Sequence, residues 1–207
     1  MNSLLHVIVI SGFMQSGKGT LCKHLMVKNK GIYYISSGEL VRYNLENETP
    51  IGIRIMDEVS CGNYINCDTI SALCLQEVQR IVTETDILVL DGFPRTCKQV
   101  EAMTSFLEKK RPNYKLIHIA VTTPSSVCRD RALRAAEGKG DRFSRTDAKM
   151  ESFENRLKAD MAHMHALGDS LKDKGAQVVH IDGTNMLDNI TIYSSDVMQL
   201  IPATQCS

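Results

Sequence analysis

A glycine-rich loop between a short apolar run and a helical segment constrains the fold of this chain more than any other feature of its sequence. Residues 4–10 are almost continuously apolar, which is typical of a strand buried on both faces of a parallel sheet. In the loop that follows, Gly12, Gly17 and Lys18 match the G-x(4)-G-K pattern of a phosphate-binding loop, or P-loop. Leucines at helical spacing from Lys18 to about Asn29 predict the helix that such a loop precedes.

The loop has the chemistry to hold phosphate groups. Backbone N–H groups at the start of a helix are unpaired donors beside a partial positive charge, and both features attract phosphate oxygens. Lys18 adds a full positive charge near the terminal phosphates. A glycine-rich turn that only caps an ordinary helix is the alternative, and the preceding strand together with the lysine argues against it.

Strands and helices alternate along the rest of the chain. Further strands are expected at residues 32–35, 86–90, 115–121 and 177–181, and helices at 38–45, 68–83, 98–110, 125–174 and from about 187, with a glycine-bearing interruption at 137–141. Asp68 is expected to cap its helix. The alternation predicts an α/β fold with a five-stranded parallel sheet flanked by helices. Residues 38–67 and 131–146 lie outside it, after strand ends where open α/β sheets bind ligands.

Composition excludes several other classes of protein. The chain has 207 residues, which suits one domain, and 24 basic against 24 acidic residues give no overall attraction to nucleic acid or to a membrane. With 5% aromatic residues and no Trp, a base-stacking surface is not expected. No apolar run approaches the roughly 18 residues of a transmembrane helix, and the seven cysteines lack paired spacing. We therefore expect free thiols in a cytoplasmic enzyme or nucleotide-binding domain.

A second motif begins where the third strand ends. Asp91 closes that strand, where a P-loop protein places the acid that holds Mg²⁺ or its water shell. The run D-G-F-P-R-T-C-K-Q at residues 91–99 resembles the hallmark of the nucleoside monophosphate kinases, adenylate kinase above all. The other motifs of that family follow in order: S-S-G-E-L-V-R at 36–42, G-N-Y-I at 62–65, Arg145, Asp147 and Arg156 of the lid, and I-D-G-T at 181–184. The resemblance covers residues from about 5 to 190.

The resemblance implies a three-layer P-loop kinase fold and reversible, Mg²⁺-dependent transfer of a phosphoryl group from ATP to AMP, giving two ADP. The ATP-binding residues that it implies are Gly12, Gln15, Ser16, Gly17, Lys18, Gly19, Thr20 and Arg131. The AMP-binding residues are Ser37, Gly38, Arg42, Gly62, Ile65, Gly92, Arg95 and Gln99, and the catalytic residues are Lys18, Asp91, Arg95, Arg145 and Arg156. Mg²⁺ is expected to bind through nucleotide phosphates and water near Thr20 and Asp91, without a direct protein ligand. The family division is a core at 1–37, 68–130 and 147–207, an AMP-binding insertion at 38–67 and a lid at 131–146.

Arginines are expected to offset the charge of two polyanions brought end to end. Between Arg129 and Lys158 there are nine Lys or Arg against six Asp or Glu. A solvated helix face is the ordinary explanation for any one of them, but arginine binds phosphate oxygens two at a time. By resemblance, Arg42 and Arg95 hold the monophosphate, and Arg131, Arg145 and Arg156 the triphosphate, with Arg131 also stacking on its base. Arg134 or Arg142 supplies a further lid arginine, and the spacing leaves both open.

Two alternatives to an adenylate kinase stay open, and departures from the family pattern motivate the first. Met14 and Gln15 stand where adenylate kinases usually carry Pro-Gly, and a side chain resists the positive φ that the glycine would allow. Ala148 replaces the second acid of the usual lid pair, and the lid is short. A weakly catalytic nucleotide-binding module is therefore one alternative. A UMP/CMP kinase of the same fold is the other, although pyrimidine-specific relatives carry Asn where this chain has Gln99. Small-molecule substrates and a monomer are expected.

Overall fold

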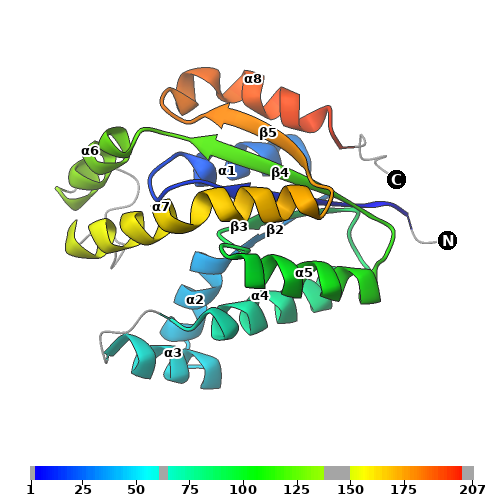
Figure 1. The fold of residues 1–207 in the computed structure, drawn as a ribbon, viewed down its shortest axis with the longest axis horizontal. Helices are drawn as coiled ribbons and strands as arrows, with labels where there is room; N and C mark the ends of the chain where they lie inside the picture. Colours follow the sequence, from blue (N-terminus) through cyan, green and yellow to red (C-terminus); the bar gives the residue numbers. More distant parts are fainter. Residues whose placement is uncertain (1–2, 61–64, 138–149, 202–207) are drawn as a thin grey trace.

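The protein is built on a five-stranded parallel sheet in the order β2-β3-β1-β4-β5 (Figure 1). The computed structural model describes residues 3–60, 65–137 and 150–201. Its strands are β1 (Leu5–Ser11), β2 (Ile32–Ser36), β3 (Ile87–Asp91), β4 (Tyr114–Thr122) and β5 (Gln177–Asp182). The helices in these residues are α1 (Lys18–Lys28), α2 (Ser37–Glu46), α3 (Pro50–Ser60), α4 (Cys67–Ile81), α5 (Cys97–Lys110), α6 (Ser125–Ala136), α7 (Met150–Asp173) and α8 (Met186–Met198). The predicted α/β fold with five parallel strands is confirmed.

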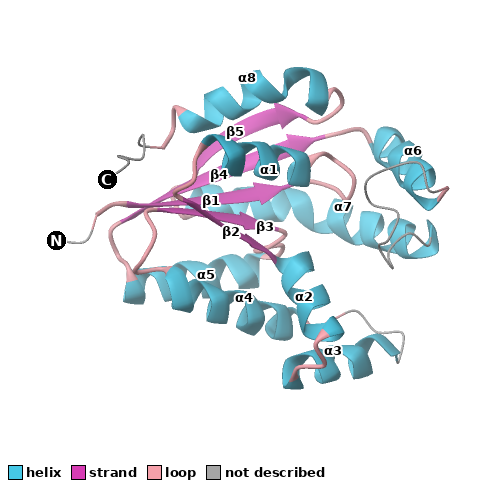
Figure 2. Ribbon diagram, turned by 180° about the vertical axis from the view of Figure 1, so that it is seen from behind, coloured by secondary structure: helices cyan, strands magenta, loops and turns pink. Residues whose placement is uncertain are grey.

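Helices cover both faces of the sheet, because successive side chains of each strand point to opposite sides. Leu5, Val7 and Val9 of β1 pack in one core with residues of α4, α5 and α7. Ile8 and Ile10 pack in a second core with residues of α1 and α8. Figure 2 shows α1 on one side of the strands and α7 on the other. Burial of both faces explains why β1 reads as a continuous apolar run.

The predicted cap of α4 is wrong. The side chain of Asn66 accepts a hydrogen bond from the N–H of Asp68 at 2.8 Å, so Asn66 is the cap and Asp68 lies in the first turn. The carboxylate of Asp68 instead pairs with Lys98 at 2.8 Å. Asn and Asp are equally good caps, and the residue that precedes the first helical turn takes the role. The helical insertion at 38–67 contains α3 as well as the predicted first helix.

Arg111 joins several chain segments by hydrogen bonds at the end of the sheet where the strands begin. It is only 3% exposed, and its guanidinium donates to the carbonyls of Val82 (2.7 Å), Thr85 (3.2 Å) and Ser3 (3.0 Å). A further bond to the Asp86 carboxylate measures 2.8 Å. One side chain therefore connects the segment before β1, the turn after α4 and the residue before β3.

Two predictions about composition can be examined in the part of the chain that the structure describes. The five cysteines found there are free. No helix within these same residues combines the length and the apolar character that crossing a membrane requires.

Candidate active site

The P-loop and the D-G-F-P-R motif meet at one edge of the sheet. β1 and β3 are parallel neighbours, and Ile10 pairs with Asp91 in their register. The P-loop leaves β1 directly after Ser11, and the second motif leaves β3 at Asp91. Parallel strands end at the same side of a sheet, so two motifs far apart in the sequence open onto the same space.

The P-loop has its anion-binding shape in this structure. Gly12 has φ 148°, and a Cβ there would come 2.5 Å from the carbonyl oxygen of Val121, so the position requires glycine. Gly17 is the N-cap of α1 and has no side chain to cover the first N–H groups of the helix. Lys18 Nζ donates to the carbonyls of Gly12 and Phe13, at 2.7 Å each. The lysine therefore lies over the loop beside the uncovered helix N-terminus.

Gln15 adopts the backbone conformation that its side chain was expected to resist. Its φ is 64°, in the left-handed region that glycine favours, and this costs a residue with a Cβ roughly 1–2 kcal/mol. Next to it, Phe13 and Met14 pack against a core cluster that includes Phe153 and Leu157 of α7. Packing of the loop onto the helices replaces the family's Pro-Gly as the feature that holds this conformation.

Arg131 and Arg156 reach the P-loop from α6 and α7. The guanidinium of Arg131 donates to Gln15 O at 3.0 Å and to the carbonyls of Gly183 (2.9 Å) and Thr184 (2.7 Å). Arg156 Nη1 lies 3.5 Å from the sulfur of Met14. Two of the three arginines predicted to hold the triphosphate are therefore brought to the loop, and Arg131 also links it to the turn between β5 and α8.

Asp91 is held by a tyrosine that sequence reasoning missed. Tyr34 on β2 donates from its hydroxyl to Asp91 Oδ2 at 3.0 Å. Burial, followed by the negative charge of Asp91, raises the pKa of Tyr34, so the phenol stays a proton donor. The sequence carried no signal for this pair, because the pair depends on the register of the sheet: Ser36 pairs with Asp91, and Tyr34 lies two residues earlier on the same side of β2.

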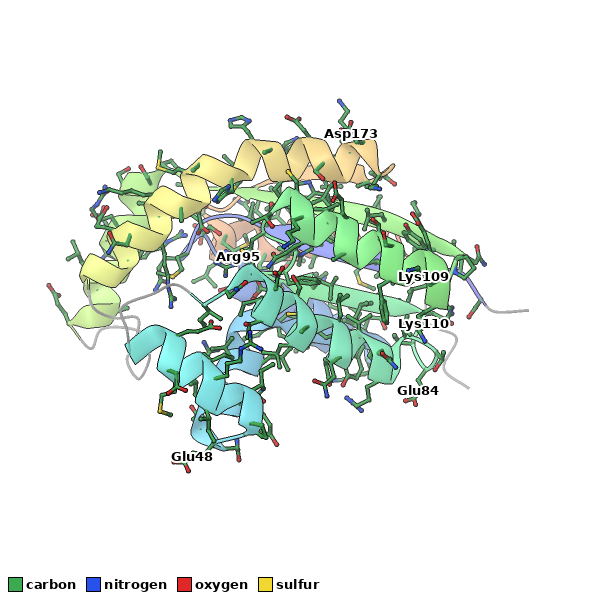
Figure 3. The ribbon with its side chains drawn as sticks, turned by 60° about the horizontal axis from the view of Figure 1, so that its bottom comes forward. Glu48, Glu84, Arg95, Lys109, Lys110 and Asp173 are labelled. Atoms are coloured by element: carbon green, nitrogen blue, oxygen red, sulfur yellow. The ribbon has the colours of Figure 1, made fainter. Side chains whose placement is uncertain are left out.

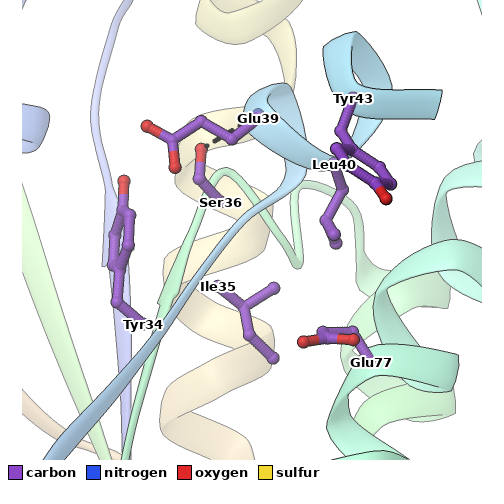
Figure 4. A pocket seen from close by; sticks show the side chains of 7 residues that line it. All are labelled: Tyr34, Ile35, Ser36, Glu39, Leu40, Tyr43 and Glu77. Atoms are coloured by element: carbon purple, nitrogen blue, oxygen red, sulfur yellow. Dashed lines mark hydrogen bonds between the residues drawn. The ribbon is translucent and has the colours of Figure 1, made fainter. Parts of the chain in front are cut away.

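The surroundings of Asp91 fit a hydrated Mg²⁺. The hydrogen bond from Tyr34 engages one carboxylate oxygen of Asp91, and the carboxylate of Glu39 points toward the same hydroxyl (Figure 4). Thr20, the other residue expected near Mg²⁺, lies in the first turn of α1. Carboxylate and hydroxyl oxygens are the donors that Mg²⁺ and its water shell prefer.

Five predicted AMP-site residues form a second polar cluster. Ser37 Oγ donates to Gly92 O at 2.9 Å, and Arg95 Nε donates to the same carbonyl at 2.9 Å. Gly92 has φ 76°, and a Cβ there would come 2.6 Å from Ser37 Oγ and 3.0 Å from Arg95 Nη2. On α2, a Cβ at Gly38 would come 3.4 Å from Arg42 Nη1, so this guanidinium lies over the start of the helix. Both features suit an anion.

Gln99 is buried, and both polar atoms of its amide are hydrogen-bonded to the backbone. It is 3% exposed, Oε1 accepts from Arg95 N at 2.7 Å, and Nε2 donates to Cys67 O at 3.2 Å. These bonds join the D-G-F-P-R loop to the start of α4. The predicted role in recognising the base stays a prediction. Ile65, another predicted contact of the base, precedes the Asn66 cap of the same helix.

A cavity of about 160 Å³ opens beside the polar cluster around Gly92, between β2, α2 and α4 (Figure 4). Its lining residues are Tyr34, Ile35, Ser36, Glu39, Leu40, Tyr43 and Glu77. Glu39, Leu40 and Tyr43 occupy a different face of α2 from Gly38 and Arg42. The cavity therefore lies next to the proposed anion sites and not within them.

A buried Ser–His pair supports the start of the P-loop. Ser11, the last residue of β1, lies with Oγ 2.8 Å from Nε2 of His118 on β4. Burial lowers the pKa of His118 to about 4, with a smaller contribution from His180. His118 is therefore neutral near pH 7 and supports the loop through a hydrogen bond without a charge.

Several predicted site residues, most of them in or near the lid, lie outside the residues that the structure describes. Gly62, predicted to bind AMP, lies outside the described residues, as do Arg142, Arg145, Asp147 and Ala148 of the predicted lid and the residues after it. Arg134 is exposed on α6. The choice between Arg134 and Arg142 as a further lid arginine therefore stays open.

Comparison with known proteins agrees with this arrangement. Residues 10–176 match the family model described as adenylate kinase. The adenylate kinase of Micrococcus luteus is 27% identical over 184 residues, which cover 89% of this chain and 86% of that protein. That of Bacillus velezensis is 27% identical over 217 residues, 94% and 97% of the two chains. That of Borrelia garinii subsp. bavariensis is 30% identical over 173 residues, 73% and 79%.

Proposed function

The chain belongs to the adenylate kinase family, and we propose that it catalyses reversible, Mg²⁺-dependent transfer of the terminal phosphoryl group of ATP to AMP, giving two ADP. One observation carries this proposal: two anion-binding groups of residues open at the same edge of the sheet, one on the P-loop and one around Gly92. A reaction between two nucleotides requires two such sites facing each other.

ATP binds at the P-loop in this proposal. The N–H groups of the loop and of the first turn of α1 bind phosphate oxygens, and Lys18 turns from the carbonyls of Gly12 and Phe13 to the terminal phosphates. Arg131 and Arg156 add positive charge beside the loop, and Arg145 is expected to join them from the lid. Such fixed charges stabilise the transferred group in the transition state.

AMP binds at the second cluster. Arg95 and Arg42 hold its phosphate, and Gly92 and Gly38 allow a close approach of the backbone. Gln99 reads the adenine edge, because a primary amide matches the neighbouring donor and acceptor of that base. Each of the two amide atoms makes one backbone bond, so the second N–H of Nε2 and the second lone pair of Oε1 are the groups proposed to meet the base.

The donor set around Asp91 supports the expected Mg²⁺. When bound with ATP, the ion neutralises phosphate charge. Asp91 would hold water molecules of its shell, and Thr20 would lie beside it. Tyr34 keeps the Asp91 carboxylate in one orientation through the 3.0 Å hydrogen bond, so these oxygens are placed before the nucleotide arrives.

Positioning and exclusion of water carry most of the catalysis. Phosphoryl transfer needs little proton transfer by the protein, so no general base is assigned. The insertion at 38–67 and the lid at 131–146 are proposed to close over the nucleotides and exclude water. We place the protein in the cytoplasm, as a monomer that binds no nucleic acid or membrane.

A coupled assay of ADP formation tests the proposal. Purified protein is supplied with ATP and, in turn, AMP, CMP, UMP and GMP, with Mg²⁺ or with a chelator. We expect turnover with AMP and Mg²⁺. A preference for CMP or UMP would support the pyrimidine kinase alternative. Binding of ATP without turnover on any acceptor would indicate a nucleotide-binding module.

A further inference from the structure

We propose that Asp160 is an internal counter-ion of Arg95, and that the phosphate of AMP must displace it before Arg95 can bind that phosphate. The inference rests on the proposed function, because it assigns Arg95 to the acceptor site. It adds a positioning residue that acts on affinity for AMP through the arginine.

The contact joins two elements that are distant in the sequence. Arg95 Nη1 lies 3.6 Å from Asp160 Oδ1, and Asp160 belongs to α7. Figure 3 shows Arg95 close to that helix, which is drawn in yellow. The Nε of the same guanidinium donates to Gly92 O at 2.9 Å. Arg95 is therefore held between the loop after β3 and a carboxylate on α7.

Asp160 lies within the group of cations that the phosphates are expected to reach. It follows Arg156 by four residues, so the two share a face of α7. The pKa of the Cys128 thiol is raised chiefly by burial and is influenced less strongly by Arg131, Lys18 and Asp160. These three charges therefore all act on one thiol, which packs with residues of α7 and of the P-loop.

A carboxylate and a phosphate compete for the same guanidinium. Both offer oxygen acceptors to the arginine fork, and an Nη that faces one of them is less available to the other. The phosphate of AMP carries up to two negative charges, so it is also repelled by a carboxylate a few ångströms away. Asp160 therefore opposes AMP binding at Arg95 in two ways, by attracting the Nη1 end of the guanidinium from 3.6 Å and by repelling the phosphate.

The exposure of the two side chains makes exchange possible. The Arg95 side chain is 51% exposed, whereas that of Asp160 is 18% exposed. An ion pair with one partner half in water contributes little stability, so an incoming phosphate can replace the carboxylate. Until then, Asp160 keeps the guanidinium near the position where it is needed. The expected result is a site whose arginine is in position before AMP arrives, but which binds AMP less tightly than the same site would without the Asp160 carboxylate.

Calorimetric titration with AMP and with adenosine tests the inference. Asp160→Asn keeps the shape of the side chain and removes its charge, so AMP should bind roughly three- to tenfold more tightly. In steady-state kinetics the KM for AMP should fall while the KM for ATP stays unchanged. Adenosine, which lacks the phosphate, should bind equally to both proteins. Asp160→Glu should restore the weaker AMP binding.

Two controls separate this effect from a structural one. Asp169→Asn removes an exposed carboxylate from the opposite side of α7 and should leave AMP affinity unchanged. In an Arg95→Met background, Asp160→Asn should bring no gain, because the two residues act through one contact.

Three results would overturn the inference: unchanged or weaker AMP binding by Asp160→Asn, an equal gain for adenosine, or a gain that persists without Arg95. If the wild-type protein neither binds AMP nor forms ADP from it, the proposed function itself fails. A wild type that binds AMP with no response to Asp160→Asn refutes the counter-ion role alone.

Discussion

Replacing Gln15 with glycine should stabilise the protein, although the substitution removes a side chain. Gln15 has φ 64°, and the left-handed region costs a residue with a Cβ roughly 1–2 kcal/mol. Glycine in the unfolded chain has more conformational freedom, which offsets about 0.4–1 kcal/mol of that gain. The hydrogen bond from Arg131 is made to the Gln15 carbonyl, which the substitution retains. We expect a net gain of up to about 1.6 kcal/mol in the free energy of unfolding, with a central value of about 0.8 kcal/mol.

Urea and thermal unfolding, followed by circular dichroism, measure this gain. For a chain of this size, each kcal/mol corresponds to about 2–4 °C in Tm. Gln15→Ala is the matched control, because alanine keeps the Cβ and with it the strain, so its stability should stay near that of the wild type. Glu48→Gly is a second control, because Glu48 has φ 46° in the turn between α2 and α3 and should show a similar gain far from the P-loop.

The expected kinetic result follows from the same observation. The loop already has the left-handed conformation at Gln15, so Gln15→Gly should leave kcat and the KM for ATP close to the wild-type values. Two outcomes would contradict the reasoning: a loss of stability in Gln15→Gly, or a gain in Gln15→Ala as large as in Gln15→Gly. Either would mean that the glutamine side chain, and not backbone strain, decides the energy at this position.

Three further predictions concern catalysis, acceptor binding and pH. Lys18→Met should lower kcat about a hundred- to a thousandfold in the ADP assay while the circular dichroism spectrum is retained, and near-native turnover would refute the P-loop assignment. Gln99→Ala should lower kcat/KM for AMP roughly ten- to a hundredfold, because its amide is proposed to contact the base and also positions Arg95. The KM for ATP should change little. Unchanged AMP kinetics would remove Gln99 from the acceptor site. Because burial lowers the pKa of His118 from 6.5 to about 4, the unfolded chain gains a proton there between these pH values and the folded protein does not. Stability should therefore fall as the pH drops from 6.5 to 4, by on the order of 3 kcal/mol, and His118→Gln should flatten that slope in urea unfolding.

The sheet and the P-loop could be predicted because their determinants are local. A strand buried on both faces leaves a continuous apolar run, as in residues 4–10, and the glycines of the loop stand at fixed spacing before the lysine. Ends of elements were less certain where two residues could serve equally well. Asn66 and Asp68 are both good caps, and the sequence alone does not show which one precedes the first helical turn.

Contacts between distant segments could not be predicted in the same way. The pairs Tyr34–Asp91 and Arg95–Asp160 join side chains that only the register of the sheet and the packing of α7 bring together. At Gln15 a correct local rule gave an incomplete prediction. A residue with a Cβ normally avoids positive φ, but Gln15 adopts it where the neighbouring residues pack onto α7.

The position of Arg111 separates two ways in which a substitution can harm this enzyme. Its bonds to Ser3, Val82, Thr85 and Asp86 lie where the strands begin, at the far end of the sheet from the P-loop. Loss of a buried charge network of this kind acts on the population of folded molecules. In a cell, such variants would be present in smaller amounts, because chaperones and proteases act on the unfolded fraction. Each molecule that stays folded would turn over at its normal rate.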